Sequence, residues 1–247
     1  MRDVSWPKGG AWRSYLLLWL VAWLLSAGWL AWWGYEESFL RLHFWRSDWL
    51  DATMPHFTHL GDGLLLTGLM GCLLYRRAVA WWLLMATMVL VALAVALAKG
   101  VLFPDWGRPA LVFDERVELV QLSLRPLLHR SFPSGHATAA TAATIWPLLG
   151  GSLRGWGWGL GVGLFSLAMA YSRVYIGVHF LGDVLVGSLL GVGLALLMYR
   201  AGRSPLARWM QERSATWQRR QRAGQLWLSV SMVVGGALSV WDYYYVG

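Results

Sequence analysis

Long apolar runs separated by short polar or basic segments make up most of the chain. A helix needs about 20 predominantly apolar residues to cross the hydrocarbon core of a bilayer. Six runs predict transmembrane helices over residues 15–33, 63–75, 79–103, 137–149, 156–174 and 180–199, and a final run over residues 226–241 predicts a seventh. We therefore expect an all-α fold, a polytopic transmembrane helix bundle of six core spans plus a seventh, as one integral membrane domain over residues 1–247.

The distribution of Lys and Arg along the chain predicts the orientation of this bundle. If the N-terminus is cytoplasmic, the inner segments hold most of the 21 Lys and Arg residues, and the outer side holds nearly all carboxylates and all six His residues. Cytoplasmic loops carry such an excess of basic residues. The basic stretch at 200–225 follows the sixth span, and we expect an amphipathic helix on the cytoplasmic surface there, with a solvated linker as the alternative.

The composition supports a membrane protein. Hydrophobic residues make up 57% of the chain and charged residues 14%, which excludes a disordered chain and is too apolar for a soluble domain. The 19 Trp residues suit membrane interfaces, where an apolar ring with one polar edge is favoured. The net charge of +8 then indicates orientation and contact with anionic lipid, and we expect no nucleic-acid partner.

Three segments at the predicted outer ends of the spans carry polar groups that could do chemistry. The first reads KGVLFPDWGRP over residues 99–109. Lys99 and Arg108 bracket it and could converge on an anion, with the planar guanidinium suited to phosphate oxygens and the ammonium acting as a point charge. The structural alternative is a Lys99 side chain that extends to the interface beside an ordinary loop arginine.

The second segment reads FPSGHATA over residues 132–139. Ser134 can cap a helix that starts here, and Gly135 lets the backbone approach a ligand closely. The free N–H groups of that helix N-terminus can bind an anion, with His136 beside it in the first turn. An ordinary capped helix start with an interfacial histidine is the alternative.

The third segment reads SRVYIGVHFLGD over residues 172–183. Arg173 ends the fifth span, and His179 and Asp183 stand four residues apart on one helix face. A carboxylate there can accept a hydrogen bond from one imidazole nitrogen and leave the other free as a base or nucleophile. A structural His–Asp pair is the alternative.

Taken together, the three segments bring cations, a helix N-terminus, two histidines and a carboxylate to one membrane face. That set suits phosphoryl transfer through a covalent intermediate, because cations neutralise the phosphate oxygens while a nucleophile and an acid act on phosphorus and the leaving oxygen. Three other histidines, His43, His56 and His59, lie in the first outer loop, where a metal site is conceivable but the spacing favours an ordinary loop surface.

At these residues the chain resembles the type 2 phosphatidic acid phosphatase superfamily, whose signature is a Lys/Arg-Pro segment, PSGH and SR-x5-H-x3-D. PSGH at 133–136 and the third motif at 172–183 match in full. The first motif departs, because eight residues rather than six separate Lys99 from Arg108, so Arg108 matches more closely than Lys99. The resemblance covers residues 79–199.

The resemblance implies a role for each matching residue. His179 would attack phosphorus and form a phosphohistidine, Asp183 would orient it, and His136 would protonate the leaving group and then activate water. The phosphate would be held by Lys99, Arg108, Arg173 and the backbone of Ser134 and Gly135. The family needs no metal or other cofactor, and the sequence lacks a carboxylate cluster of the kind that holds magnesium.

We therefore expect a metal-independent lipid phosphate phosphatase in the bacterial inner membrane, with a cytoplasmic N-terminus and the active site facing the periplasm. By resemblance, the substrate would be a lipid phosphate monoester or pyrophosphate of the undecaprenyl pyrophosphate, phosphatidylglycerol phosphate, phosphatidic acid or lipid A type. A lipid phosphotransferase that uses the same intermediate is the alternative. A non-catalytic lipid-binding or transport protein is a third hypothesis.

Overall fold

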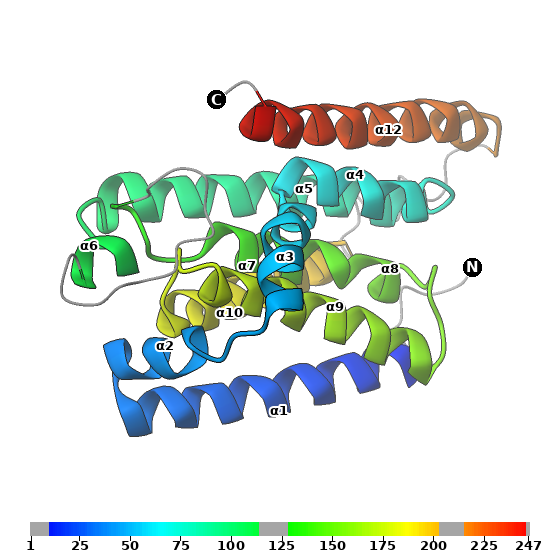
Figure 1. The fold of residues 1–247 in the computed structure, drawn as a ribbon. Coiled ribbons are helices and arrows are strands. Elements are labelled where there is room, and N and C mark those ends of the chain that lie inside the picture. Colours follow the sequence, from blue (N-terminus) through cyan, green and yellow to red (C-terminus); the bar gives the residue numbers. More distant parts are fainter. Residues whose placement is uncertain (1–9, 114–127, 203–214, 246–247) are drawn as a thin grey trace.

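Each apolar run forms one or two helices in the computed structural model, which describes residues 10–113, 128–202 and 215–245. The long helices run side by side (Figure 1), and the described residues contain no strand, as predicted for an all-α fold. The helices that correspond to the seven runs are α1 (Gly10–Trp33), α4 (Gly63–Leu74), α5 (Ala78–Leu97) continued by the π-helical turn η2 (Ala98–Leu102), α7 (Gly135–Thr144) with α8 (Trp146–Leu149), α9 (Trp156–Tyr175), α10 (Leu181–Ala201) and α12 (Ala215–Tyr245). The shorter elements are α2 (Tyr35–His43), α3 (Asp48–Phe57), the 3₁₀ turn η1 (Thr58–Gly61) and α6 (Pro109–Phe113).

Fewer of these helices can cross a membrane than the sequence pattern predicts. Among the described residues, α1, α5 with η2, α10 and Gln221–Trp241 of α12 are long and apolar enough, and α3 to α4 form a pair bent by 68° that would make a fifth span. The count of six plus one is thus not confirmed. Two of the helices are too short, because α4 has 12 residues and α7 has 10, and at about 1.5 Å per residue both fall short of a hydrocarbon core of about 30 Å. Helix α9 has 20 residues and is long enough, but its glycines and Arg173 make it less apolar than the candidate spans.

Helix α7 lies at the centre of the bundle and contacts α10, α9, α5 and α4. Figure 1 shows α1 and α12 on opposite sides, where α1 packs on α9 and α12 packs on α4. Every residue of α7 from Ala137 to Thr144 is buried, and all are Ala or Thr. Small side chains let helix backbones approach closely, which brings the ends of the neighbouring helices together around the start of α7.

Two glycines of α10 permit its close contact with α7. A Cβ atom added to Gly187 would lie 2.6 Å from the Ser134 carbonyl oxygen, and one added to Gly191 would overlap Thr141 Oγ1 and the Thr138 carbonyl oxygen. The backbones therefore pack directly against each other. This contact carries the first turn of α10 to the first turn of α7.

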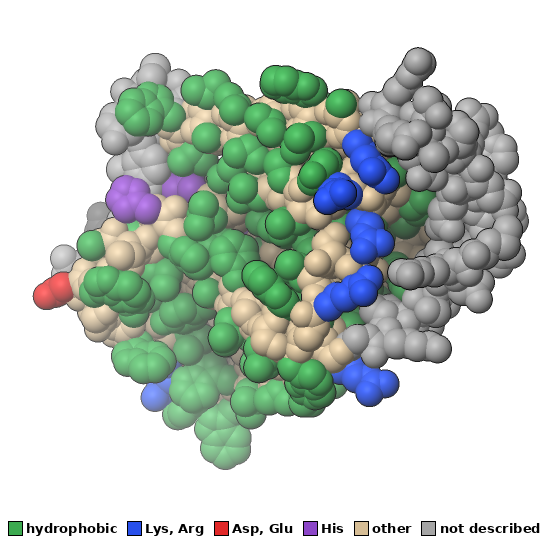
Figure 2. Space-filling model, turned by 90° about the vertical axis from the view of Figure 1, so that its right-hand side faces the viewer, with side chains coloured by type: hydrophobic (Ala, Val, Ile, Leu, Met, Phe, Trp, Pro, Cys, Tyr) green, Lys and Arg blue, Asp and Glu red, His purple; other side chains and the backbone are tan. Residues whose placement is uncertain are grey.

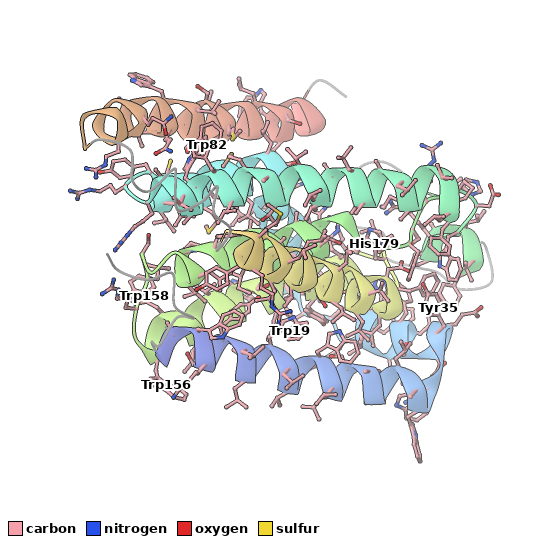
Figure 3. The ribbon with its side chains drawn as sticks, turned by 180° about the vertical axis from the view of Figure 1, so that it is seen from behind. Trp19, Tyr35, Trp82, Trp156, Trp158 and His179 are labelled. Atoms are coloured by element: carbon pink, nitrogen blue, oxygen red, sulfur yellow. The ribbon has the colours of Figure 1, made fainter. Side chains whose placement is uncertain are left out.

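The bundle has two chemically different ends. Figure 3 shows Trp82, Trp156 and Trp158 at one end and Tyr35 and His179 toward the other. Figure 2 looks onto the tryptophan end, where Lys and Arg side chains lie in a row. The exposed arginines of the chain segments at this end are Arg13, Arg76, Arg77, Arg154 and Arg200. The predicted inner basic residues within the described chain thus share one end, and the membrane side of that end stays a prediction.

Helix α12 joins part of the basic stretch to the last apolar run. It begins at Ala215 and continues to Tyr245, so the second part of the 200–225 segment belongs to the same helix as the predicted seventh span. The first part, residues 203–214, lies outside the described residues. The Trp81 indole N–H donates to Ser229 Oγ at 2.9 Å, and a Cβ added to Gly236 would lie 2.6 Å from the Leu65 amide nitrogen. Close backbone packing and this hydrogen bond hold α12 on α4 and α5.

Candidate active site

His179 and Asp183 lie at the turn between α9 and α10. Gly177 adopts a positive φ of 79°, which favours glycine, and the amides of Val178 and His179 both donate to the Arg173 carbonyl at 3.2 Å. Asp183 sits in the first turn of α10, where its Oδ2 lies 3.2 Å from His179 Nδ1. The predicted pairing four residues apart is present, and it leaves His179 Nε2 free to face the rest of the site.

Arg108 lies against that second nitrogen. Its guanidinium is buried, and Nη1 stands 3.4 Å from His179 Nε2. The same nitrogen donates to the Val178 carbonyl at 3.0 Å, and Nε donates to the His129 carbonyl at 2.9 Å. Backbone carbonyls thus fix a delocalised cation at the atom from which a nucleophilic attack would start.

Arg173 is held by a residue of the 3₁₀ turn η1. It stands in the last turn of α9 and is buried, and its Nη1 donates to Thr58 Oγ1 at 2.8 Å. Ser172 Oγ donates to the same hydroxyl oxygen at 2.9 Å. The 3₁₀ turn η1, which contains Thr58, therefore positions this arginine.

Ser134 starts α7 as the sequence predicts. Its Oγ accepts a hydrogen bond from the Ala137 amide at 3.4 Å, and its own amide donates to the Asp183 carbonyl at 3.0 Å. The N-terminus of α7, with Gly135 and His136 in its first turn, is therefore fastened to the first turn of α10. A Cβ added to Gly61 would lie 3.4 Å from His136 Cδ2, so η1 also borders His136.

Lys99 joins the other two cations despite its unusual spacing from Arg108. It lies in the π-helical turn η2, where the Phe103 amide donates to the Ala98 carbonyl at 2.7 Å, and a further turn follows at Phe103. A π-helical turn takes up one residue more than an α-turn. We call Lys99, Arg108 and Arg173 the cation cluster, because all three act electrostatically on His179.

The environment of His179 favours the neutral imidazole. His179 lies in the turn before α10 and is buried. Burial above all, and then the cation cluster, hold its pKa well below the ordinary value for histidine. Asp183 accepts on the Nδ1 side, so the neutral ring carries its proton there and keeps a lone pair on Nε2.

Three residues that sequence reasoning did not single out complete the site. Ser131 Oγ donates to Asp183 Oδ2, the Tyr35 hydroxyl donates to Asp183 Oδ1, and Thr58 accepts from Arg173. Ser131 stands two residues before PSGH, a position that could have drawn attention. Tyr35 and Thr58 precede all three motifs by a long stretch of chain, and no local pattern marks them.

The histidines between α1 and α4 have different environments. His43 is buried, stacks on Phe39 with a ring distance of 5.0 Å, and lies 3.3 Å through Nδ1 from the Val174 carbonyl. His59 is half-buried and lies close enough to Arg173 and His136 to act on them electrostatically. Within the described ranges, no three His, Cys, Asp or Glu side chains form a group that could hold a metal ion.

Comparison with known proteins decides the family. The family described as the PAP2 superfamily matches residues 79–204, about half of the chain. The chain belongs to the PAP2 superfamily. All eight residues that the sequence predicts for the site lie inside the matched region, whereas Tyr35 and Thr58 lie upstream of it.

Two curated relatives of this PAP2 protein are named as phosphatases. Decaprenylphosphoryl-5-phosphoribose phosphatase of Mycobacterium tuberculosis is 33% identical over 158 residues, which cover 61% of this chain and 80% of that protein. Phosphatidylglycerophosphatase B of Bacillus subtilis is 32% identical over 173 residues, which cover 62% of this chain and 75% of that protein.

A solved structure shows the same fold. The crystal structure of Aquifex aeolicus LpxE is 29% identical, with a TM-score of 0.58, and covers 67% of this chain and 94% of that chain. The family, the named relatives and the apolar helices together identify a membrane phosphatase, as the sequence predicts.

Proposed function

We propose that this PAP2 phosphatase removes a phosphate from a lipid phosphate or lipid pyrophosphate at the outer face of the bacterial inner membrane through a phosphohistidine. The observation that carries the proposal is the pair of contacts on His179, with Nδ1 3.2 Å from Asp183 Oδ2 and Nε2 3.4 Å from Arg108 Nη1. Together the two contacts hold the neutral imidazole with the lone pair of Nε2 toward the cation cluster. A phosphate bound there would meet the nucleophile.

In the first half of the reaction, His179 Nε2 attacks phosphorus and the P–O bond to the leaving group breaks. His136 donates its proton to the departing oxygen, and Asp183 stabilises the positive charge on the phosphorylated imidazole. The cation cluster and the amides at the start of α7 neutralise the phosphoryl oxygens. The lipid product leaves with a hydroxyl, or with one phosphate fewer if it entered as a pyrophosphate.

In the second half, water replaces the lipid. His136 now accepts a proton from water, the water oxygen forms a bond to phosphorus, and the N–P bond breaks. Inorganic phosphate leaves, His136 is protonated again, and His179 returns to the neutral form. His136 thus transfers a proton in opposite directions in the two halves, while His179 forms and then breaks the bond to phosphorus.

The named relatives support a lipid phosphate as the substrate. One name specifies a decaprenylphosphoryl sugar phosphate and the other a phosphatidylglycerophosphatase, so an isoprenoid lipid and a glycerolipid are both represented. We therefore retain undecaprenyl pyrophosphate, phosphatidylglycerol phosphate, phosphatidic acid and lipid A phosphates as candidate substrates.

The test is phosphate release by the full-length protein in detergent from each of these four lipids, with EDTA present. We expect release from at least one lipid and at least a 100-fold loss in His179→Ala, because removal of a covalent nucleophile disables the intermediate. His56→Ala is the matched control, since His56 is exposed on α3. Full activity in His179→Ala would contradict the proposed nucleophile.

Product analysis separates hydrolysis from transfer. The same intermediate can pass its phosphoryl group to a lipid hydroxyl, so the assay includes a second lipid as an acceptor. Free phosphate supports the phosphatase. A newly phosphorylated lipid without free phosphate would establish the phosphotransferase in its place.

A further inference from the structure

A tyrosine far upstream of the family motifs reaches the carboxylate behind the nucleophile. Tyr35 opens α2, and its hydroxyl donates to Asp183 Oδ1. The Trp106 indole N–H donates in turn to the Tyr35 hydroxyl oxygen at 3.0 Å. We propose that Tyr35, supported by Trp106, is a positioning residue that holds Asp183 in the orientation His179 needs for attack. The inference rests on the proposed phosphoryl transfer at His179.

Each oxygen of the Asp183 carboxylate has its own donors. Oδ2 accepts from the Ser131 hydroxyl and from the Phe180 amide at 3.1 Å, and it faces His179 Nδ1. Oδ1 accepts from Tyr35. Because Asp183 is fully buried, loss of the Tyr35 hydroxyl would leave Oδ1 without this donor, and the contacts of Oδ2 alone would then fix the orientation of the carboxylate.

The ring of Tyr35 is positioned independently of its hydroxyl. It packs on Phe180 with a ring distance of 4.6 Å, and a Cβ added to Gly182 would lie 2.5 Å from Tyr35 Cε2. Glycine at 182 therefore makes room for the aromatic ring. A phenylalanine at position 35 can keep these contacts and lose the hydroxyl alone.

The hydroxyl of Tyr35 remains a donor throughout the working pH range. Burial first, and then the neighbouring Asp183 carboxylate, raise the pKa of Tyr35 above its ordinary value. Trp106 is partly exposed and packs against Phe132 with a ring distance of 5.3 Å. We call the hydrogen-bonded series Trp106–Tyr35–Asp183 the relay. It runs from the surface through two aromatic side chains to the carboxylate.

The experiment compares full-length Tyr35→Phe with wild type on the lipid that the wild type hydrolyses. We expect kcat to fall about 10-fold, as for loss of one hydrogen bond to a charged group, and KM to stay within about twofold, because Tyr35 touches Asp183 and not the cation cluster. The acidic limb of kcat/KM should move to higher pH. The reason is that an Asp183 carboxylate with one donor fewer stabilises the protonated His179 ring more strongly, which raises the pKa of His179.

The pH shift distinguishes positioning from a structural defect. The charged or titratable groups that act on His179 are Asp183, His136, Lys99, Arg108 and Arg173. Of these groups, Tyr35 donates to Asp183 alone, so Tyr35→Phe should move the limb only through that carboxylate. A partly unfolded sample would instead lower kcat without moving the limb. A fall in kcat with an unchanged limb would therefore overturn the proposal.

Two further variants sharpen the result. Tyr15→Phe is the matched control, because Tyr15 is fully buried in the core cluster with Trp12 and Trp19 on α1, and we expect no change in kcat or in the pH limb. Trp106→Phe should lower kcat less than Tyr35→Phe. The double variant should be no slower than Tyr35→Phe alone, since both changes act through one hydroxyl. Additive losses would contradict the relay.

Orthovanadate binding keeps this test separate from the proposed function. Vanadate takes the five-coordinate geometry of the transferring phosphoryl group, so it reports on His179 even without a lipid substrate. We expect Tyr35→Phe to weaken vanadate binding about 10-fold and to leave inorganic phosphate binding unchanged. Equal vanadate affinity would overturn the relay whether or not a lipid is hydrolysed. If wild type binds no vanadate, both the relay and the proposed function fail.

Discussion

The two nitrogens of His179 meet opposite electrostatic environments. Nδ1 faces a carboxylate that is itself held by hydroxyl and amide donors, and Nε2 faces a guanidinium anchored to backbone carbonyls. The ring is buried, so neither interaction is weakened by bulk water. These contacts favour a neutral ring and fix the direction of its Nε2 lone pair, as the proposed attack on phosphorus requires.

The charge of Lys99 should set the pH dependence of the enzyme. Burial first, and then the cation cluster, lower the pKa of His179, so the reactive neutral form persists to lower pH and is lost as the pH falls through that lowered pKa. Lys99→Met removes one cation, raises the pKa of His179 and moves the acidic limb of kcat/KM to higher pH. The pH profile of phosphate release measures this shift.

Lys99→Arg is the control for that experiment, because it keeps the charge and should leave the limb near its wild-type position. Both variants act on the same lipid, whose own ionisation is unchanged. An unmoved limb in Lys99→Met would show that Lys99 does not act on His179 in solution.

Thr58 should control phosphate affinity through Arg173. Thr58→Val keeps the shape of the side chain but removes the oxygen that accepts from Arg173 Nη1 at 2.8 Å and from Ser172 Oγ at 2.9 Å. We expect inorganic phosphate to bind about 10-fold more weakly, as for loss of a hydrogen bond to a charged group. Titration calorimetry measures the affinity directly.

Thr53→Val is the matched change on the neighbouring helix α3, where the hydroxyl donates to the Trp49 carbonyl at 2.8 Å on the exposed surface. It should bind phosphate as the wild type does. Equal affinity in both variants would show that Arg173 holds its place without Thr58.

At the scale of elements, the site is the meeting point of helix ends. The turn before α10 brings His179, the first turn of α7 brings His136, and the last turn of α9 brings Arg173. The close packing of α10 on α7 joins the first two, and the amide of Ser134 donating to the Asp183 carbonyl marks the contact. Changes to this packing should therefore affect catalysis from a distance.

Gly191 offers a direct test of the α7–α10 contact. A methyl group there would overlap Thr141 Oγ1 and the Thr138 carbonyl oxygen, so Gly191→Ala must push the helices apart. We expect a loss of about 1–3 kcal/mol in the free energy of unfolding, together with reduced kcat. Thermal unfolding in detergent and phosphate release measure the two effects.

Gly193 lies two residues further along the same helix, and a Cβ added there meets nothing within 4 Å. Gly193→Ala should therefore keep the activity and match or exceed the wild-type stability, because alanine favours the helix. Similar losses in both variants would contradict the packing explanation.

At the scale of the whole molecule, the arginine-rich end of the bundle lies opposite the end that contains the candidate active site (Figure 3). This separation supports a topology in which the arginine-rich end faces the cytoplasm. Cys72 is the single cysteine of the chain, so Cys72→Ser provides a background for labelling. In right-side-out vesicles, an impermeant maleimide should label Trp45→Cys, a position 76% exposed between α2 and α3.

Arg154→Cys, in the exposed turn before α9, should be labelled only after the vesicles are permeabilised. Both cysteine variants must retain phosphate release for the comparison to hold. The reverse labelling pattern would invert the proposed orientation and place the site on the cytoplasmic side.

Local sequence patterns were sufficient for much of the site. His179 and Asp183 stand four residues apart, a spacing that places them on one helix face in any helix, and Ser134 is a helix cap by residue type. The apolar runs likewise predicted where helices form, since burial in lipid or protein depends on composition. The number of spans could not be read in the same way, because α7 and α4 are apolar through burial among other helices while too short to cross alone.

The sequence by itself determined the helical class, the family and the residues of the three motifs, because each depends on composition or on spacing within one segment. Only the tertiary structure decided which other residues reach them. Tyr35 and Asp183 are 148 residues apart, and Thr58 and Arg173 are 115 apart. The first contact depends on how α2 packs on α10, and the second on how η1 packs on α9. That packing is set by the fit of whole faces, such as Gly182 against the Tyr35 ring, which no single segment encodes.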